Sequence, residues 1–412
     1  MNNIDAPALE ETFDEVHEIP NEQLEGWGRK YNGSILECEG KRMFAYRRYN
    51  PRHHRCDIGI AQLDEQWEPV WSKGIEMPCE SGKEHYEDPR LFIFGGKVWV
   101  ATSMITDYNR RPWISIQKAF RLNRDWEVEH EIVPPIGRNG SAQEKNWQFF
   151  DYDGRLMVSY MPKNNTVYEI NEEDGSVVQR WASGRAEWPY GSFSGGTPPV
   201  LWGENYLSFF HGFAECLPSP YSRRYFFGAY TFAKEPPFEM TGITAGPLSY
   251  GSGKNKWYPQ PAFFGWEPYV VFPAGVIDSG NKFHISVGVN DCYNVVVGIS
   301  KQELSRKLVQ PRETAKAMRA FVTDDMRVSL IPSLLRKTSF RPIRVGKLGI
   351  WSVTKTLDPA SIEYMESLPD VYFPLENDEY ESYINGGTPK DLFVRLRSGM
   401  QPNKRSMKYG IR

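Results

Sequence analysis

The chain has 412 residues, of which 40% are hydrophobic and 25% are charged, and its formal net charge is −3. These proportions are typical of a soluble globular protein with a large core, so they exclude wholesale disorder. The near-neutral charge gives no basic field that would by itself indicate a nucleic-acid partner. No uninterrupted run of about 18 apolar residues predicts a membrane-spanning helix.

Residues 1–26 form a predicted acidic N-terminal arm. The first 25 residues contain eight Asp or Glu and no Lys or Arg, whereas a secretory signal has a basic start and an apolar run. The five cysteines are odd in number, widely spaced and without a C-x-x-C pair: Cys38, Cys56, Cys79, Cys216 and Cys292. We therefore expect reduced thiols and a cytoplasmic location, rather than a disulfide framework or a zinc site.

Aromatic residues make up 14% of the chain, alongside 35 Gly and 30 Pro. Because aromatic residues are favoured in strands and Gly and Pro in turns, this composition favours an all-β fold. Aromatic rings also stack on sugar rings, so a sugar-binding role stands beside the commoner interpretation of a β core.

Five segments share one design: an apolar run, a polar turn with a glycine, and an alternating apolar run. Each predicts a β-hairpin, and they cover residues 34–47, 91–103, 148–160, 199–211 and 274–286. The turn glycines Gly40, Gly96, Gly154, Gly203 and Gly280 are separated by 56, 58, 49 and 77 residues. Such intervals suit four-stranded blades, with room for further hairpins at residues 56–71 and 166–181. We predict a five-bladed β-propeller over residues 27–300, followed by a mixed C-terminal appendage over residues 301–412.

Polar residues recur at fixed distances from these glycines. Asn32, Asp88 and Asn146 stand eight residues before the turn, and Arg47, Ser103, Tyr160 and His211 stand six to eight residues after it. The start and the end of a hairpin lie at the same end of the sheet. If these hairpins line the central channel, the polar side chains gather at one mouth of the propeller, a concave place that suits a ligand.

The densest of these clusters runs from Tyr86 to Arg90, with Glu87, Asp88 and Pro89 between them. Pro89 biases Asp88 toward an extended conformation. A carboxylic acid in an enclosed site can have a raised pKa and act as a general acid, and the alternative is a salt-bridged turn.

Cationic and hydrogen-bonding residues from several blades predict an anion subsite, because guanidinium groups bind phosphate oxygens in pairs. The candidates are Arg47, Arg90, Arg111, Lys145 and His211. Each alone is readily explained as a structural residue. Asp291, after the fifth hairpin, offers a carboxylate for sugar hydroxyls.

No motif for a metal or an organic cofactor is found, so we expect neither. The sequence lacks a Walker A motif, G-x-G-x-x-G after a strand, H-E-x-x-H and G-x-S-x-G. His53 and His54 lie beside Cys56, but without partner ligands they indicate a surface loop.

The last 110 residues depart from the hairpin pattern. A helix is predicted from the N-cap Ser300 with Glu303 completing a capping box, and another over residues 359–367. Residues 395–412 contain six Lys or Arg and no acid. This basic tail is either a solvated end or a segment that docks on the acidic arm or on a polyanionic acceptor. We expect the appendage as a whole to pack on the propeller or on a second subunit of a homo-oligomer.

At these residues the sequence resembles glycoside hydrolase family 130, the five-bladed propellers that include β-mannoside phosphorylases and hydrolases, and the related propeller mannosyltransferases. The likeness covers roughly residues 28–302 and depends on the order of several short boxes. The boxes are Asn32 with Tyr46-Arg47, Glu87 to Arg90, Lys145 followed by Asn146 where the family usually has Asp, Pro198-Pro199 through His211, Gly228-Ala229 through Pro236-Pro237, and Val271 to Gly275 with Asp291.

The resemblance implies an inverting glycoside phosphorylase acting on β-mannoside-type linkages, with a sugar and inorganic phosphate or a sugar phosphate as substrates. It makes Asp88 the general acid. The residues predicted to contact the sugar are Asn32, Arg47, Glu87, Arg90, Asn146, Tyr160 and Asp291, and those predicted to bind phosphate are Arg47, Arg111, Lys145 and His211. The alternatives are a glycosyltransferase with an activated sugar donor, a hydrolase with Glu87 or another acid as base, and a non-catalytic sugar-binding propeller.

Overall fold

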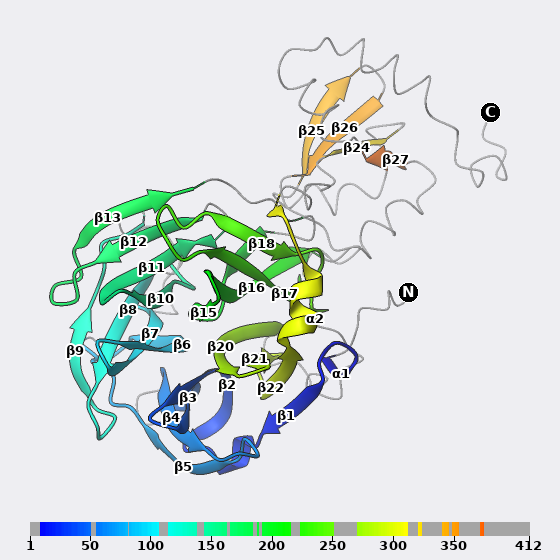
Figure 1. Cartoon of the computed structure of the whole chain (residues 1–412). Coiled ribbons are helices and arrows are strands. Elements are labelled where there is room, and N and C mark those ends of the chain that lie inside the picture. Colours follow the sequence, from blue (N-terminus) through cyan, green and yellow to red (C-terminus); the bar gives the residue numbers. More distant parts are fainter. Residues whose placement is uncertain are drawn as a thin grey trace.

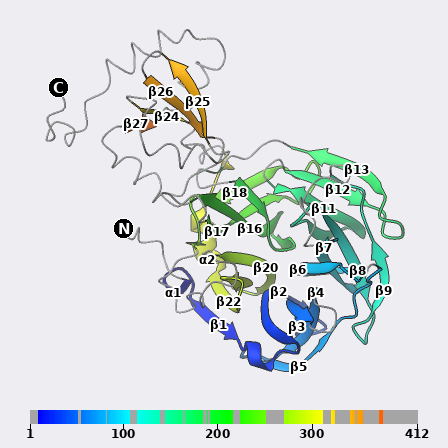
Figure 2. The ribbon, with the colours of Figure 1, turned by 180° about the vertical axis from the view of Figure 1, so that it is seen from behind.

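The computed structural model describes residues 9–50, 55–80, 82–106, 114–137, 144–162, 165–183, 188, 192–215, 223–250, 270–311, 320–323, 340–345, 348–353 and 371–374. Five antiparallel sheets are arranged around a common axis (Figure 1; from behind in Figure 2). The predicted all-β, five-bladed propeller is thereby confirmed. Within the described ranges, no helix is long and apolar enough to cross a bilayer.

The first three blades are simple four-stranded meanders. Blade 1 consists of β2 (Trp27–Cys38), β3 (Lys41–Asn50), β4 (Arg55–Leu63) and β5 (Pro69–Gly74). Blade 2 consists of β6 (His85–Phe94), β7 (Lys97–Ile105), β8 (Ser115–Leu122) and β9 (Val128–Ile132). Blade 3 consists of β10 (Gln148–Tyr152), β11 (Arg155–Met161), β12 (Thr166–Ile170) and β13 (Val177–Ala182).

The fourth and fifth blades each include a strand from a distant part of the sequence, β23 (Leu308–Val309) in blade 4 and β1 (Glu15–Ile19) in blade 5. In blade 4, β14 (Ser192–Gly195) and β15 (Val200–Trp202) both pair with β16 (Asn205–Glu215), followed by β17 (Arg223–Ala233), β18 (Met240–Thr244) and the short β19 (Ser249–Tyr250) and β23. Blade 5 consists of β20 (Val271–Ser279), β21 (Lys282–Val289), β22 (Tyr293–Ser300) and the N-terminal strand β1.

The five predicted glycine hairpins are confirmed. They join β2 to β3, β6 to β7, β10 to β11, β15 to β16 and β20 to β21. The five turn glycines all adopt φ between 63° and 74°, a left-handed conformation that glycine adopts without steric cost. The additional hairpins expected at residues 56–71 and 166–181 are also present, as β4–β5 and β12–β13.

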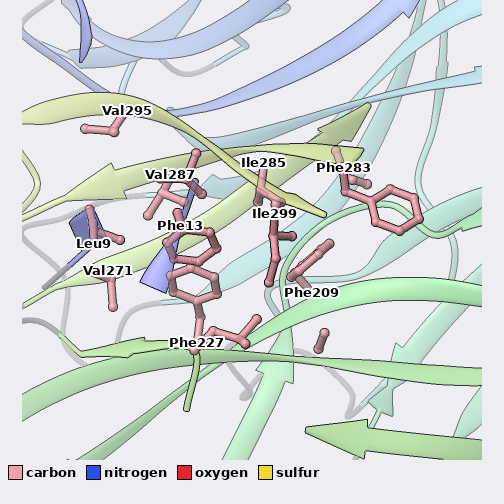
Figure 3. Packing of buried hydrophobic residues seen from close by; sticks show 14 of the residues in the cluster. Leu9, Phe13, Phe209, Phe227, Val271, Phe283, Ile285, Val287, Val295 and Ile299 are labelled. Carbon is pink, nitrogen blue, oxygen red and sulfur yellow. The ribbon is translucent and has the colours of Figure 1, made fainter. Parts of the chain in front are cut away.

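Strand β1 closes the ring by pairing antiparallel with β22. Ile19 at its end is fully buried, and the Glu15 carboxylate bonds to Lys282 and His284 of β21. Just before it, α1 (Leu9–Thr12) leads to Phe13, whose ring stacks on Phe227 of blade 4 within the core cluster of Figure 3. The fifth blade therefore takes its outer strand from the segment predicted as an N-terminal arm.

After β22 the chain forms α2 (Lys301–Lys307), where the Ser300 side chain accepts a hydrogen bond from the Glu303 amide, as the predicted N-cap requires. A sheet in the order β25 (Phe340–Val345), β26 (Leu348–Val353), β24 (Ala320–Thr323) and β27 (Val371–Pro374) follows. The short 3₁₀ helix η1 (Asn21–Gln23) completes the described elements. The helix predicted over 359–367 and the basic tail 395–412 lie outside the described residues.

Truncating the closing strand should destabilise the propeller. We expect Ile19→Ala to lower the free energy of unfolding by about 2–4 kcal/mol, because a fully buried side chain is lost from the seam between β1 and β22. Glu18→Ala is the matched control, since Glu18 is the exposed residue of the same strand and should change stability by no more than ~0.5 kcal/mol. Denaturant unfolding measures both, and equal effects would show that β1 does not hold the ring closed.

Candidate active site

The inner strands of blades 1 and 2 contain the same irregularity at the same place. In β2 the register shifts by one residue between Tyr31 and Ser34, and in β6 it shifts by one residue between Glu87 and Arg90. Each shift is a β-bulge, a feature that redirects side chains beside ligand sites.

The bulges place Asn32 and Asp88 in left-handed backbone, with φ of 52° and 53°. The extended conformation expected for Asp88 from the following Pro89 is therefore wrong. Asn and Asp are the non-glycine residues that tolerate this conformation best. Asn146, at the corresponding position before β10, has φ of 66°, so the three residues picked out by counting from the turn glycines share one backbone conformation.

Asn32 links two carboxylates from different blades. Its Nδ2 donates to Asp88 Oδ1 at 3.0 Å and to Asp291 Oδ1 at 3.3 Å. Its Oδ1 is buried and has no hydrogen-bond partner among the described residues. Blades 1, 2 and 5 thus meet at a single amide group.

Glu87 lies between two cations. Its Oε1 is 2.6 Å from Arg47 NH2, and its Oε2 accepts from Lys145 Nζ at 2.7 Å. Arg47 NH1 is also 4.0 Å from Asp88 Oδ1, and its guanidinium lies 4.8 Å over the Tyr31 ring. Blades 1, 2 and 3 therefore share one charged network, and the Glu87 side chain is only 5% exposed.

Arg90 is fully buried, and its three guanidinium nitrogens all donate to protein oxygens. Nε donates to Gly196 O, NH1 to Asp88 O and NH2 to Asn146 Oδ1. The guanidinium also lies 5.2 Å over the Phe272 ring. This side chain ties the Asp88 backbone to blades 3 and 4.

His211 on β16 is 6% exposed and packs on Phe272, with ring centroids 4.5 Å apart. Burial, reinforced by the charge of Arg90, lowers the pKa of His211 to about 3. The imidazole is therefore neutral at pH 7 and can only act as a hydrogen-bonding group. Its Nδ1 is buried without a partner in the described part of the chain.

The two remaining predicted site residues are Tyr160 and Arg111. Tyr160 packs edge-on against Trp147 and donates to Glu144 at 3.4 Å, so it supports the segment that carries Lys145 and Asn146. Arg111 lies outside the described residues.

The two carboxylates on Asn32 are in opposite electrostatic environments. Burial alone would raise the pKa of Asp88, but Arg47, Lys145 and Arg90 outweigh it and hold that pKa below its ordinary value. Burial raises the pKa of Asp291 to about 6, and the neighbouring Asp88 adds to the rise. Carboxyl groups whose pKa values are pushed apart in this way are typical of acid–base sites.

Two contributors were missed in the sequence: Tyr31 supports Arg47, and Gly288 leaves room for Asn32. Phe272 belongs to the predicted box from Val271 to Gly275 and stands eight residues before its turn glycine. Its ring contacts both the Arg90 guanidinium and the His211 imidazole. Among the described residues, no group of three or more His, Cys, Asp or Glu is arranged to hold a metal ion.

No family model and no curated protein matches this sequence. The structure is similar to that of a protein from Parabacteroides distasonis described as a candidate glycoside hydrolase, with a TM-score of 0.50 at 13% identity over 66% of this chain and 87% of that one. This likeness supports the propeller fold.

Two further similar structures each have a TM-score of 0.49. One is β-1,2-mannobiose phosphorylase from Listeria innocua in complex with β-1,2-mannobiose, 16% identical over 68% of this chain and 91% of that one. The other is a mannose phosphorylase from Leishmania mexicana in complex with a phosphate ion, 14% identical over 72% of this chain and 92% of that one.

Displacing the Asn32 side chain should break its hydrogen bonds to Asp88 and Asp291 without unfolding the blade. A methyl group at Gly288 would overlap Asn32 Oδ1, so Gly288→Ala should displace the amide from Asp88 and Asp291. We expect turnover to fall by about 10- to 100-fold, as for a displacement near 1 Å. The control is Gly40→Asn, at a left-handed hairpin turn with open space, where Asn is tolerated. Unchanged turnover in Gly288→Ala would show that the amide does not position the carboxylates.

The raised pKa of Asp291 should appear in the pH dependence of stability. Its folded pKa of about 6 exceeds the ordinary 3.8, so the folded protein binds the proton more tightly than the unfolded chain does. The free energy of unfolding therefore falls as pH rises from about 4 to 6. Asp291→Asn should remove this fall, gaining about 2–3 kcal/mol relative to the wild type between pH 4 and pH 7.

Denaturant unfolding at pH 4, 5, 6 and 7 tests this expectation. Asp125→Asn, in the exposed turn between β8 and β9, is the control and should follow the wild-type profile. Parallel profiles for Asp291→Asn and the wild type would contradict the assignment.

Proposed function

We propose that this protein is an inverting glycoside phosphorylase that acts on β-mannoside-type linkages, with Asp88 as the general acid. The observation that carries the proposal is the meeting of Asp88 with Asn32, Asp291, Arg47 and Lys145 in one buried cluster built from four blades. The family resemblance of the boxes that supply these residues supports the same reaction.

In the proposed reaction a phosphate oxygen attacks the anomeric carbon, and the bond from that carbon to the glycosidic oxygen breaks. The electron pair goes to the leaving oxygen, which takes a proton from Asp88 directly or through a sugar hydroxyl. The products are an inverted sugar 1-phosphate and a free acceptor hydroxyl, and Asp88 then regains a proton from solvent. Holding the nucleophile and the sugar in line supplies much of the rate.

The lowered pKa of Asp88 fits this scheme once phosphate binds. Arg47 and Lys145 lower that pKa, and a phosphate on the same cations weakens their effect and adds a negative charge. Both changes raise the pKa of Asp88. The bound nucleophile thus favours the protonated form of the acid, while Asn32 and Asp291 orient the sugar and neutral His211 offers a hydrogen bond.

A hydrolase is the second candidate, favoured by the pairing of Glu87 with both Arg47 and Lys145. These cations are already neutralised, and a neutral nucleophile such as water does not need to displace Glu87. In that case a carboxylate acts as the base that activates the water.

A donor screen tests the proposal. We expect phosphate-dependent release of mannose 1-phosphate from β-mannosides, and a fall of about 10²- to 10⁴-fold in Asp88→Asn because proton donation is lost. Asp125→Asn is the matched control in an exposed turn and should keep full activity.

The other outcomes identify the alternatives. Equal turnover without phosphate indicates a hydrolase, and transfer from a nucleotide sugar alone indicates a glycosyltransferase. Sugar binding without turnover of any donor, unchanged in Asp88→Asn, indicates a binding propeller and rejects the proposal.

A further inference from the structure

Arg47 and Lys145, two of the cations that lower the pKa of Asp88, are both held by one carboxylate. Arg47 NH2 and Lys145 Nζ approach different oxygens of Glu87, at 2.6 and 2.7 Å. A phosphate bound between the same cations would present two oxygens in a similar way. Glu87 therefore occupies the position in which the cations would hold an anionic substrate.

The pairing is buried. The exposed fractions of the Glu87 and Arg47 side chains are 5% and 13%, and that of Lys145 is 27%. Buried ions in short contact attract each other strongly, and removal of one partner leaves an uncompensated charge. Lys145, the most exposed of the three, gives the side from which an anion would reach the pair.

We propose that Glu87 is an internal ligand of the cationic subsite, and that phosphate binds by exchanging with the Glu87 carboxylate on Arg47 and Lys145. This inference rests on the proposed phosphorolysis and adds a specificity-determining role for Glu87. Water or a sugar hydroxyl reaches the sugar without this exchange. The strength of the pairing of Glu87 with Arg47 and Lys145 therefore determines how well phosphate competes as the nucleophile.

The exchange has a consequence for protons. Tyr31, Arg47, Lys145 and Asp291 interact electrostatically with Glu87, and Asp88 follows it in the chain. Cys56 acts on Arg47, and Arg90 acts on Asp88. A second anion beside this cluster leaves its carboxylates with less positive charge to offset them, and a buried carboxylate without a cation takes up a proton. Asp291, whose pKa burial raises to about 6, is well placed to do so. Anion binding should therefore be accompanied by proton uptake and weaken as pH rises.

The experiment measures binding of inorganic phosphate and of sulfate by calorimetry, without turnover, to the wild type and to Glu87→Gln. The amide keeps the shape of the side chain but removes its charge, so both anions should bind about tenfold more tightly or better. Glu87→Asp is the control: it retains the competing charge, so neither anion should bind much more tightly than to the wild type.

A second measurement needs no variant. Sulfate keeps its charge between pH 6 and 8, so its affinity for the wild type reports only on the protein. We expect this affinity to fall by up to about tenfold per pH unit. This measurement keeps the inference testable if Glu87→Gln does not fold.

The outcomes separate this inference from the proposed function. Tighter anion binding in Glu87→Gln, or a fall of sulfate affinity with pH in the wild type if that variant does not fold, supports the exchange. Unchanged or weaker binding in folded Glu87→Gln overturns it, as does a flat sulfate profile if that variant does not fold, while phosphorolysis stands if the wild type releases sugar phosphate. Absence of anion binding to both proteins overturns the exchange, and it overturns phosphorolysis as well if the wild type releases no sugar phosphate.

Discussion

One extra residue in each of two inner strands is the constraint on which the site depends. The bulges turn the backbone at Asn32 and Asp88 into the left-handed region and bring the two side chains within hydrogen-bond distance. In a regular antiparallel ladder, successive side chains alternate between the faces of the sheet. The blade repeat thus supplies the positions, and a local departure from the repeat supplies the orientation.

Electrostatic balance is the second requirement. Three cations (Arg47, Arg90 and Lys145) lie among three carboxylates (Glu87, Asp88 and Asp291), and most of these groups are buried. Buried ions are tolerated only when they are paired. The cluster is therefore a single unit in which a new charge must be compensated by movement of a side chain or a proton.

Counting from the turn glycines was enough to predict the hairpins, the propeller and the grouping of Asn32, Asp88 and Asn146, because hairpin length fixes which residues share an end. Counting did not predict the bulges, because residue preferences and the hairpin pattern describe regular strands without an extra residue. The link between Glu87 and both cations was also beyond the sequence, because it depends on which blade lies opposite. The neutral state of His211 follows from burial and from Arg90, neither of which spacing reveals.

The pairing of β1 with β22 also has a consequence for how this chain matures. The two strands are joined by Cα partners such as Glu15 and Gly298, which are 283 residues apart. The amino-terminal strand leaves the ribosome early, yet its partner is made only after four blades have been synthesised. Contacts between such distant residues slow folding. The nascent chain must therefore keep an unpaired edge until synthesis passes residue 300, and this interval is when it is most exposed to aggregation.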